Sequence, residues 1–505
     1  MKLAISSASI ALLVLWGIVS PATLGGFFDQ ALVAVTRNFG WFYLWEVLAL
    51  VGVAAFLALS RYGNMRLGND EEEPEFSTGA WFSMLFAAGM GIGLVFWGVA
   101  EPLSHYASAP PGTVAMTPDA ANTGMKYSFF HWGFHPWAVY SMVGLAIAFF
   151  QFRRGTRVLV SAVTESLPWL PIKKVSGMFD VVAVIATAFG VATSLGIGAT
   201  QINRGLNAVF GLENSMFAEI SIIVVASGLF MLSAITGGNK GIKWLSSFNL
   251  ILAVTLLVMV LFVGPTIAII NTLTATLGAY ISDFVRLSLR MTPFRESGWV
   301  GSWTIFYWAW WISWSPFVGV FIARVSRGRT IREFVAGTVL APSIAAFVWF
   351  SVFGGTGLYL EIWQGVPVVE AVKADVSTAL FVMFDALPLG ALMSVIATVL
   401  ILLFFVTSGD SATLVLGTVS SGGQANPSLR DKLLWGCLIT GIAISLLMAG
   451  GIKAMQTATI VFALPFAVVI PLMVVALIRA IRSDWVDQVR NEKRIRRRIL
   501  EIVEK

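Results

Sequence analysis

Apolar runs of about 20 residues recur along the whole chain, and this is the length that a helix needs to cross a bilayer. Hydrophobic residues make up 57% of the 505 positions and charged residues only 12%, so no soluble core could bury this surface. Each run must be helical, because a backbone in lipid has to satisfy its own hydrogen bonds. The sequence therefore predicts an all-α polytopic membrane protein with twelve transmembrane helices, at about residues 4–25, 41–60, 78–100, 126–151, 176–203, 215–236, 246–270, 299–323, 334–357, 390–417, 433–450 and 457–481.

The basic residues predict how these spans are oriented. With the N-terminus inside, the cytoplasmic connections hold fifteen Lys and Arg residues, the outer connections eight, and the C-terminal end nine more. This asymmetry follows the positive-inside rule, so both termini are expected in the cytoplasm. The net charge of +6 then belongs beside the inner leaflet and does not indicate a nucleic-acid partner.

Little in the sequence points to enzyme chemistry. A single cysteine, Cys437, excludes an internal disulfide, and three histidines leave no cluster at metal-ligand spacing. The sequence has no phosphate-binding loop, nucleophile elbow or dinucleotide-binding pattern. We therefore expect no enzymatic activity and no organic cofactor.

Two segments lie outside the predicted spans. Residues 273–290, LTATLGAYISDFVRLSLR, carry apolar positions at helical spacing with charges opposite, which predicts an amphipathic helix in the outer interface. Residues 482–505 form a basic tail that we expect to contact anionic lipid of the inner leaflet, and an osmotic or lipid sensor is the alternative.

The stretch TIFYWAWWISWSPF, residues 304–317, places four tryptophans within one apolar span. At about 100° per residue, an arc of about 100° holds four of its rings, those of Tyr307, Trp310, Trp311 and Trp314. Such rings could simply fill space between helices. Electron-rich ring faces also attract cations, and a quaternary ammonium has no proton to donate elsewhere, so this face favours a trimethylammonium ligand.

A second aromatic set, FHWGFHPWAVY at residues 130–140, supplies Trp132, Trp137 and Tyr140. Trp132 could instead be an interface anchor, because it precedes Pro136. His131 and His135 flank this set. We interpret them as structural hydrogen-bonding groups, because no carboxylate is near them in the sequence.

Two further motifs supply polar groups within spans. Alternate glycines in FAAGMGIGLVFWG, residues 86–98, cannot share one helical face, and they predict an unwound segment. Its carbonyls could coordinate a hard cation and its N–H groups could approach a carboxylate. FFVTSGDSAT, residues 404–413, adds the hydroxyls of Thr407 and Ser408 with Asp410 nearby; a hydrogen-bonding patch between helices is the alternative.

Four motifs together resemble the betaine/choline/carnitine transporter (BCCT) family: FAAGMGIGLVFWGVAEP, FHWGFHPWAVY, GSWTIFYWAWWISWSPFVGVFIARVSRGRTIREF and FFVTSGDSAT. The resemblance implies a leucine-transporter-like 5+5 inverted repeat, with spans 3–7 related to spans 8–12 and two helices in front. It also implies alternating access, a homotrimer and a bacterial plasma (inner) membrane. The expected domains are residues 1–77, 78–298, 299–481 and 482–505.

Carried over position by position, the resemblance implies several sets of ligands. The ammonium box comprises Trp132, Trp137, Tyr140 and Trp311, with Trp310 and Trp314 along the path. The backbone that would meet a substrate carboxylate is that of Gly89, Gly91 and Gly93. A sodium site would use the carbonyls of Ala87, Met90 and Phe404 and the side chains of Thr407 and Ser408. A second ion site would use Thr187 and Phe317, although Val191, one turn after Thr187, offers no oxygen.

The same resemblance bears on coupling and substrate. Proton-coupled choline carriers of this kind have an aspartate in place of Gly93, and sodium-independent exchangers have a central arginine that these spans lack. Sodium-coupled symport is therefore expected, with proton coupling or exchange as alternatives. The ammonium box would bind betaine, choline, carnitine or dimethylsulfoniopropionate nearly alike, and a carboxylate contact at the other end favours glycine betaine, with choline as the runner-up and ectoine behind it. A non-transporting osmosensor on the same fold stays open, whereas a channel would need polar or charged rings.

Overall fold

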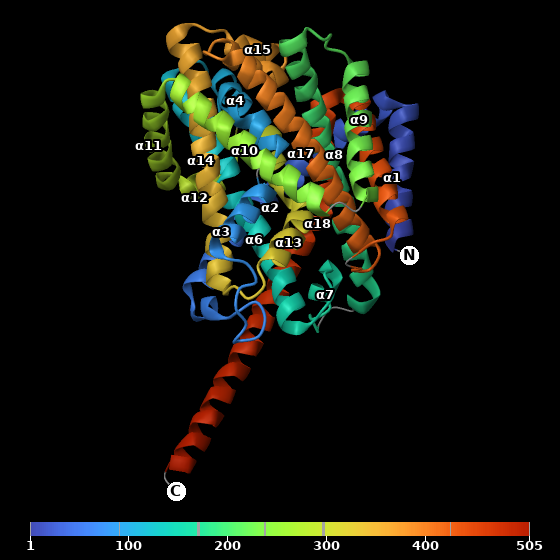
Figure 1. Cartoon of the computed structure of the whole chain (residues 1–505), viewed down its shortest axis with the longest axis vertical. Coiled ribbons are helices and arrows are strands. Elements are labelled where there is room, and N and C mark those ends of the chain that lie inside the picture. The colour runs from blue at the N-terminus through green and yellow to red at the C-terminus, as the bar shows by residue number, and fades with distance from the viewer. Residues whose placement is uncertain are drawn as a thin grey trace.

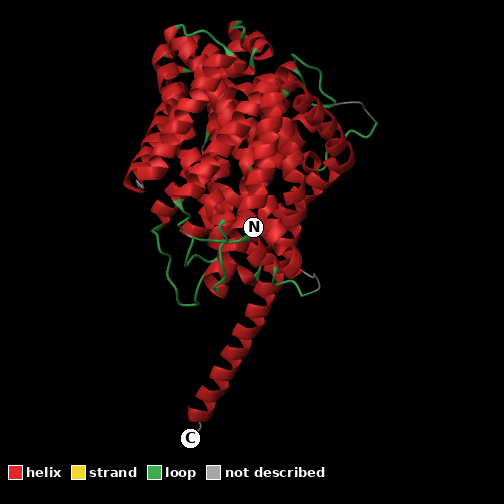
Figure 2. Cartoon of the chain, turned by 90° about the vertical axis from the view of Figure 1, so that its right-hand side faces the viewer, coloured by secondary structure: helices red, strands yellow, loops and turns green. Residues whose placement is uncertain are grey.

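The chain folds into helices and connecting loops, described by a computed structural model for residues 2–89, 91–168, 172–236, 239–294, 298–424 and 426–503. Within these ranges there is no strand, only an isolated bridge between Arg66 and Thr330. Nine of the described helices are long and apolar enough to cross a membrane, or ten if a bent pair forms one span. The prediction of an all-helical, multi-pass protein is confirmed (Figures 1 and 2).

The helices follow one another through mostly short connections. In chain order they are α1 (Lys2–Val19), α2 (Pro21–Leu59), α3 (Thr78–Gly89), α4 (Ile92–Ala107), α5 (Pro118–Trp132), α6 (Phe134–Ala148), α7 (Val160–Thr164), α8 (Ile172–Phe210), α9 (Met216–Thr236), α10 (Asn239–Val263), α11 (Thr266–Ser282), α12 (Phe284–Ser288), α13 (Phe306–Val325), α14 (Ile331–Gln364), α15 (Val368–Ala374), α16 (Ala379–Asp385), α17 (Gly390–Ser420) and α18 (Leu429–Val503). Short 3-10 or π segments are η1 (Arg61–Asn64), η2 (Phe149–Arg153), η3 (Gly301–Ile305) and η4 (Val376–Thr378).

The N-terminal boundaries differ from the prediction. The sequence predicts spans at 4–25 and 41–60 with a connection between them, but α1 ends at Val19 and α2 already begins at Pro21. Proline has its φ preset for a helix and loses no intrahelical hydrogen bond at the first helical position. Residues 26–40 are therefore part of one long helix, and the predicted connection was wrong.

Glycines mark the places where other helices break. α3 and α4 are separated at Gly91, whose backbone is extended (φ −147°, ψ −172°), and this is where the sequence predicts an unwound segment. α18 is interrupted at Gly450 (φ 158°) and Gly451 (φ 62°), conformations that residues with a side chain rarely adopt. These two glycines lie between the predicted eleventh and twelfth spans.

α10 and α11 meet at a sharp bend after Val263. The last 17 residues of α10 and the whole of α11 are inclined by 109° to each other. α11 and α12 together cover the predicted amphipathic segment 273–290, but α11 begins earlier, at Thr266. The segment is thus helical and turned away from the preceding span.

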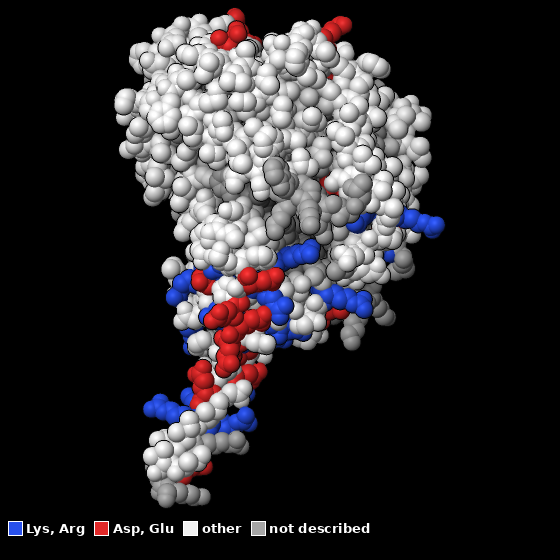
Figure 3. All heavy atoms as spheres, viewed as in Figure 1, with Lys and Arg blue, Asp and Glu red and all other residues white. Residues whose placement is uncertain are grey.

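α8 lies at the centre of the bundle, where it packs against α17, α18 and α13, and α13 also packs against α6. The C-terminal part of α18 leaves the bundle as a single projecting helix (Figures 1 and 2). On the face shown in Figure 3, charged side chains gather around the end of the bundle from which this helix projects, while the broad middle of the molecule carries very few.

Candidate functional site

A cavity of about 140 Å³ lies inside the bundle, where the start of α4 meets α5, α6, α8, α10, α13 and α17. Most of the predicted site residues line it, although they come from motifs far apart in the sequence. These are Gly91, Gly93, Trp132, Tyr140, Trp310, Trp311, Trp314, Phe317, Phe404, Thr407 and Ser408. The fold therefore brings the aromatic motifs and the polar motifs together around one space.

One side of the cavity is formed by four mutually packed rings, Trp132, Tyr140, Trp310 and Trp311, which we call the aromatic cluster. Trp132 meets Trp311 edge to face with ring centroids 4.8 Å apart, and Tyr140 meets the same ring at 5.9 Å. Trp310 stacks on Trp311 at 5.3 Å with 16° between the ring planes. Faces and edges of large aromatic rings are thus held close together beside the cavity.

Hydrogen bonds fix the orientation of the three indoles in the aromatic cluster. Each ring N–H has an acceptor: Trp132 Nε1 donates to Glu101 Oε2 at 2.8 Å, Trp310 Nε1 to Ser194 Oγ at 3.3 Å and Trp311 Nε1 to the backbone oxygen of His131 at 3.0 Å. Since all three rings are buried, these bonds also avoid unpaired donors in the interior.

Trp137 was predicted as a further member of the ammonium box, and the structure places it outside the cavity lining. It is buried and packs edge to face against Tyr140, with ring centroids 5.5 Å apart. Trp137 therefore contacts Tyr140, which lines the cavity, and does not line the cavity itself. Trp314 does line the cavity, and its ring meets Phe317 at 5.4 Å.

Gly93 leaves the space that the aromatic cluster occupies. A Cβ atom at this position would lie 2.6 Å from Cη2 of Trp310 and 3.1 Å from Cη2 of Trp132. The first distance is shorter than real Cβ contacts allow, so any side chain here would displace a ring. The requirement for glycine at position 93 is therefore steric.

The beginning of α4 faces the cavity, because Gly91, Ile92 and Gly93 all line it. The first N–H groups of a helix have no partner within the helix, and its dipole is positive at this end, so the site favours an anionic group. Of the other residues predicted here, Met90 lies outside the described residues. The structure gives Ala87 and Gly89 only as part of the helical backbone of α3.

Oxygen atoms border another part of the cavity, which we call the oxygen side, where α17 contributes Phe404, Thr407 and Ser408. Thr407 Oγ1 donates to the backbone oxygen of Leu403 at 2.9 Å and accepts from Asn249 Nδ2 at 3.4 Å. Asn249, which lies in α10 and lines the cavity, was not predicted. Ser194 and Ser411 also line the cavity and were not predicted, although Ser411 lies within the FFVTSGDSAT motif.

Thr187 and Phe317 were predicted for a second ion site. They lie on α8 and α13, which approach so closely that a Cβ on Gly190 would meet the side chains of Ser313 and Trp314. Thr187 Oγ1 is buried and has no hydrogen-bond partner among the described residues, and Phe317 lines the cavity. An unpaired oxygen is thus present at this helix crossing.

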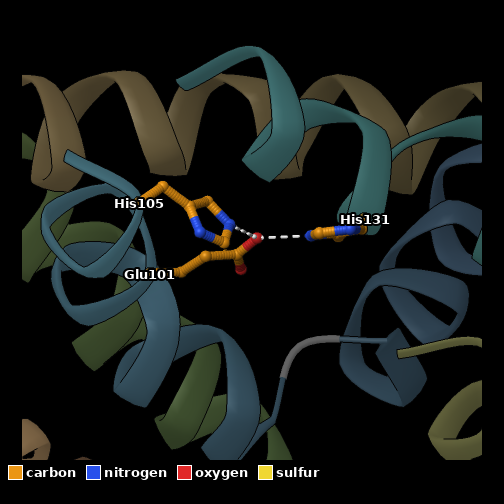
Figure 4. A group of neighbouring side chains, drawn as sticks. All are labelled: Glu101, His105 and His131. Atoms are coloured by element: carbon orange, nitrogen blue, oxygen red, sulfur yellow. Dashed lines mark hydrogen bonds and ion pairs between the residues drawn. The ribbon is translucent and has the colours of Figure 1, made fainter. Parts of the chain in front are cut away.

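A buried carboxylate behind the aromatic cluster was not predicted. Glu101 of α4 is fully buried, and its Oε1 lies 2.7 Å from His131 Nδ1 and 3.2 Å from His105 Nε2 (Figure 4). Its Oε2 accepts from Trp132 Nε1 at 2.8 Å and from the hydroxyl of Tyr307 at 2.5 Å. His131 thus has a carboxylate partner that comes from another helix, 30 residues earlier in the sequence, and it lies in a hydrogen-bonding position as the sequence analysis interpreted it.

The ligand atoms of Glu101, His105 and His131 lie within 4.8 Å of one another, a spacing that could hold a metal ion. The carboxylate already meets two hydrogen-bond donors at each oxygen, so its acceptor sites are filled by the protein itself. We therefore interpret this cluster as a hydrogen-bonded network. Two other polar groups lie outside the cavity lining: Asp410 accepts from Ser233 Oγ at 3.3 Å, and His135 Nε2 lies 2.7 Å from Ser288 Oγ.

Comparison with known proteins gives concordant matches. A family model described as BCCT, betaine/carnitine/choline family transporter, matches residues 2–486. The chain is 47% identical over 480 residues to the glycine betaine transporter OpuD of Bacillus subtilis (strain 168), covering 94% of this chain and 93% of that protein. It is 45% identical over 477 residues to an ectoine/hydroxyectoine transporter of Virgibacillus pantothenticus, covering 94% of this chain and 95% of that protein.

A third relative and a solved structure complete the comparison. A glycine betaine transporter of Acinetobacter baylyi (strain ATCC 33305 / BD413 / ADP1) is 44% identical over 455 residues, covering 89% of this chain and 68% of that protein. The chain also resembles the structure of a Na⁺-coupled sialic acid symporter in a substrate-bound outward-open state, with a TM-score of 0.49 and 13% sequence identity. The match covers 86% of this chain and 87% of the symporter chain. A likeness of this size does not establish a shared fold.

Proposed function

Since the chain belongs to the BCCT, betaine/carnitine/choline, family of transporters, we propose that it imports glycine betaine by sodium-coupled symport through alternating access. Like the other members of its family, it is a multi-pass membrane transporter and not an enzyme. The observation that carries the substrate assignment is the cavity itself, because one space is bordered by an aromatic cluster and by the start of a helix.

The aromatic cluster fits the ammonium end of the substrate. A trimethylammonium group presents only methyl groups, so it cannot use hydrogen-bond acceptors and binds best against ring faces. Trp132, Tyr140 and Trp311 border the cavity and are packed against one another at 4.8 and 5.9 Å. Because their ring positions are fixed by packing, little ordering entropy is lost when the cation binds.

The start of α4 fits the other end of the substrate. Unpaired N–H groups at a helix N-terminus attract a carboxylate, which glycine betaine has and choline lacks. Two of the relatives are named glycine betaine transporters. Ectoine is the second candidate, because a relative that is 45% identical is named an ectoine/hydroxyectoine transporter. Choline, carnitine and dimethylsulfoniopropionate rank behind these two.

Sodium is the coupling ion that the oxygen side favours. We propose the carbonyls of Ala87, Met90 and Phe404 and the side chains of Thr407 and Ser408 as its ligands. Two observations support this choice over proton coupling or exchange. Among the described residues that line the cavity there is no Asp, Glu, His, Lys or Arg, and position 93 has no room for a carboxylate side chain. A second ion near Thr187 and Phe317 would use the unpaired hydroxyl at the crossing of α8 and α13.

We also propose the number of spans, the inverted repeat, the orientation in the membrane and the oligomeric state. Twelve spans result if α3 with α4 forms one span, α10 another, and α18 is divided at Gly450. Spans 3–7 and 8–12 would form the inverted repeat, within residues 78–298 and 299–481. Charges concentrated near the projecting end of α18 support a cytoplasmic location for that end, in a bacterial inner membrane (Figure 3). Family membership further suggests a homotrimer, and the tail at 482–505 would meet anionic lipid.

The proposed function is tested by uptake of labelled glycine betaine into proteoliposomes. Separate samples receive an inward sodium gradient, an inward proton gradient or neither, and unlabelled choline or ectoine is added as competitor. We expect uptake under the sodium gradient alone, with weak inhibition by choline. Uptake under the proton gradient, or stronger transport of choline, would overturn the proposal. Counterflow of labelled against unlabelled substrate separates a carrier from a non-transporting osmosensor.

A further inference from the structure

The carboxylate of Glu101 is connected to two of the rings that line the cavity, to Trp132 directly and to Trp311 through Tyr307. It accepts hydrogen bonds from the Trp132 indole and the Tyr307 hydroxyl, at 2.8 and 2.5 Å. Tyr307 in turn stacks over Trp311, with ring centroids 6.1 Å apart and 20° between the planes. The orientation of the aromatic cluster is therefore coupled to one acidic side chain that does not itself line the cavity.

The histidines complete this connection. His131 Nδ1 lies 2.7 Å from Glu101, its Nε2 lies 3.0 Å from Thr304 Oγ1, and its backbone oxygen accepts the N–H of Trp311. His105 Nε2 faces the same carboxylate, while its Nδ1 is buried without a hydrogen-bond partner among the described residues. A second proton on His105 would have no acceptor, so this ring is best satisfied as a neutral donor.

A carboxylate in this position changes the rings electronically as well as sterically. Hydrogen bonds to an ionised acceptor are stronger than neutral ones, and they polarise the donor group. An indole or phenol that donates to a carboxylate gains electron density in its ring, and a cation is attracted by that density. The negative charge of Glu101 also acts through a poorly screening interior. No Asp or Glu is among the described residues that line the cavity itself, so none there supplies such an attraction.

We propose that Glu101 is a positioning and polarising residue: its buried carboxylate orients Trp132 and Tyr307 and makes the aromatic cluster select ligands that carry a positive charge. The inference rests on the proposed function, because it assumes that the ammonium group binds against these rings. It adds a determinant of specificity that touches neither the substrate nor the coupling ion.

The test compares two ligands that share shape and carboxylate and differ in charge. In 3,3-dimethylbutanoate a carbon atom replaces the quaternary nitrogen of glycine betaine. The dissociation constant of each ligand is measured by tryptophan fluorescence on the purified full chain at saturating sodium. Cation selectivity is the dissociation constant of 3,3-dimethylbutanoate divided by that of glycine betaine, and this is the ratio that we compare between variants. We expect Glu101→Gln to reduce this ratio about fivefold, a change typical of a weakened cation–π contact. Equal weakening of both ligands would show a merely structural role and overturn the proposal.

Further variants separate charge from shape. Glu101→Asp keeps the charge, so it should retain most of the selectivity even where overall affinity falls. Tyr307→Phe removes one hydrogen bond and keeps the ring; it should lower the ratio about twofold, and an unchanged ratio would contradict the proposal. Tyr307→Phe also provides the test if Glu101→Gln does not fold.

The matched control is Glu46→Gln, the same change at another buried glutamate, in α2, a helix that contributes no residue to the cavity lining. We expect it to leave the ratio unchanged, and a ratio lowered as far as in Glu101→Gln would overturn the proposal. Failure of the proposed function would look different from either result, because the wild-type chain would then fail to prefer glycine betaine over 3,3-dimethylbutanoate at all.

Discussion

The two sides of the cavity differ in how completely their polar groups are paired. In the aromatic cluster the indole N–H groups of Trp132, Trp310 and Trp311 all have acceptors within 3.3 Å. On the oxygen side, Asn249 reaches Thr407 only through a long contact of 3.4 Å, and Asn249 Oδ1 has no partner among the described residues. The three indoles of the aromatic cluster are thus paired without a ligand, whereas the oxygen side has an oxygen atom left to be paired.

This difference suggests separate tasks for the two sides. An aromatic cluster whose indole N–H groups are already paired is preorganised for an ammonium group, and it gains little from further ordering. An incomplete oxygen side can be ordered by a cation, which would also fix the start of α4 relative to α17. Substrate and sodium would then bind cooperatively, since each stabilises the arrangement that the other needs. The variants below probe one side at a time.

Trp311→Ala should have the largest effect, because this ring contacts Trp132, Tyr140 and Trp310. Loss of a desolvated cation–π contact and of ring packing should lower affinity for glycine betaine about 100-fold. Uptake in proteoliposomes should fall to background while the protein stays folded by circular dichroism and gel filtration. Trp363→Ala, at a 75% exposed position, is the matched control and should transport normally. Near-normal uptake by Trp311→Ala would exclude the aromatic cluster as the ammonium site.

Thr407→Ala combined with Ser408→Ala removes two hydroxyl oxygens from the other side. The sodium concentration for half-maximal uptake should rise about 30-fold, because each of the two lost oxygen contacts contributes about 1 kcal/mol. Maximal uptake at saturating sodium should change much less. Thr413→Ala serves as control on the same helix, since its hydroxyl bonds the backbone of Asp410 and does not line the cavity. An unchanged sodium dependence in the double variant would place the ion elsewhere.

Gly93→Ala should act on the aromatic side with a smaller effect. The added methyl group would lie 2.6 Å from Trp310, and overpacking of this kind costs about 1–3 kcal/mol. Affinity for glycine betaine should fall roughly fivefold, with sodium activation changed less. The matched control is Gly79→Ala, where a Cβ would meet nothing within 4 Å. Equal losses in both variants would argue against the steric role of position 93.

Truncation after Asp487 should have the smallest effect on basal uptake, within about twofold, because surface changes rarely exceed 0.5 kcal/mol. Asp484, which pairs with Arg153 and Arg154, is retained. What should be lost is the response to external osmolality in vesicles that contain anionic lipid, since each basic residue near such a surface contributes about 1 kcal/mol. An unchanged response would remove the tail from regulation and leave its role structural.

Much of the fold and of the site could be predicted because apolar run length and local motifs carry the information. The aromatic motif at 304–317 and the alternate glycines at 86–98 identify residues that line the cavity. The N-terminal boundary could not be predicted in the same way. Residues 21–59 form one helix because Pro21 starts it and nothing stops it, although the apolar pattern weakens in the middle.

The missed residues share a physical reason. Glu101 and His131 are 30 positions apart in sequence, and only the packing of α4 against α5 brings their side chains to 2.7 Å. Asn249 belongs to a different helix from Thr407, and the hydrogen bond between the two side chains joins residues 158 positions apart. Trp137 shows the converse, because it belongs to the aromatic motif and yet packs against Tyr140 outside the cavity lining. Such relations depend on helix rotation, which sequence spacing does not determine.

Reciprocal binding of glycine betaine and sodium tests the coupling of the two sides most directly. The dissociation constant of glycine betaine is measured on the purified chain without sodium and at saturating sodium. The affinity for sodium is then measured without and with saturating glycine betaine. Cooperative binding predicts that each ligand tightens the other by the same factor, as linkage requires. Glycine betaine binding that is independent of sodium would contradict the proposed symport and separate the two sides of the cavity.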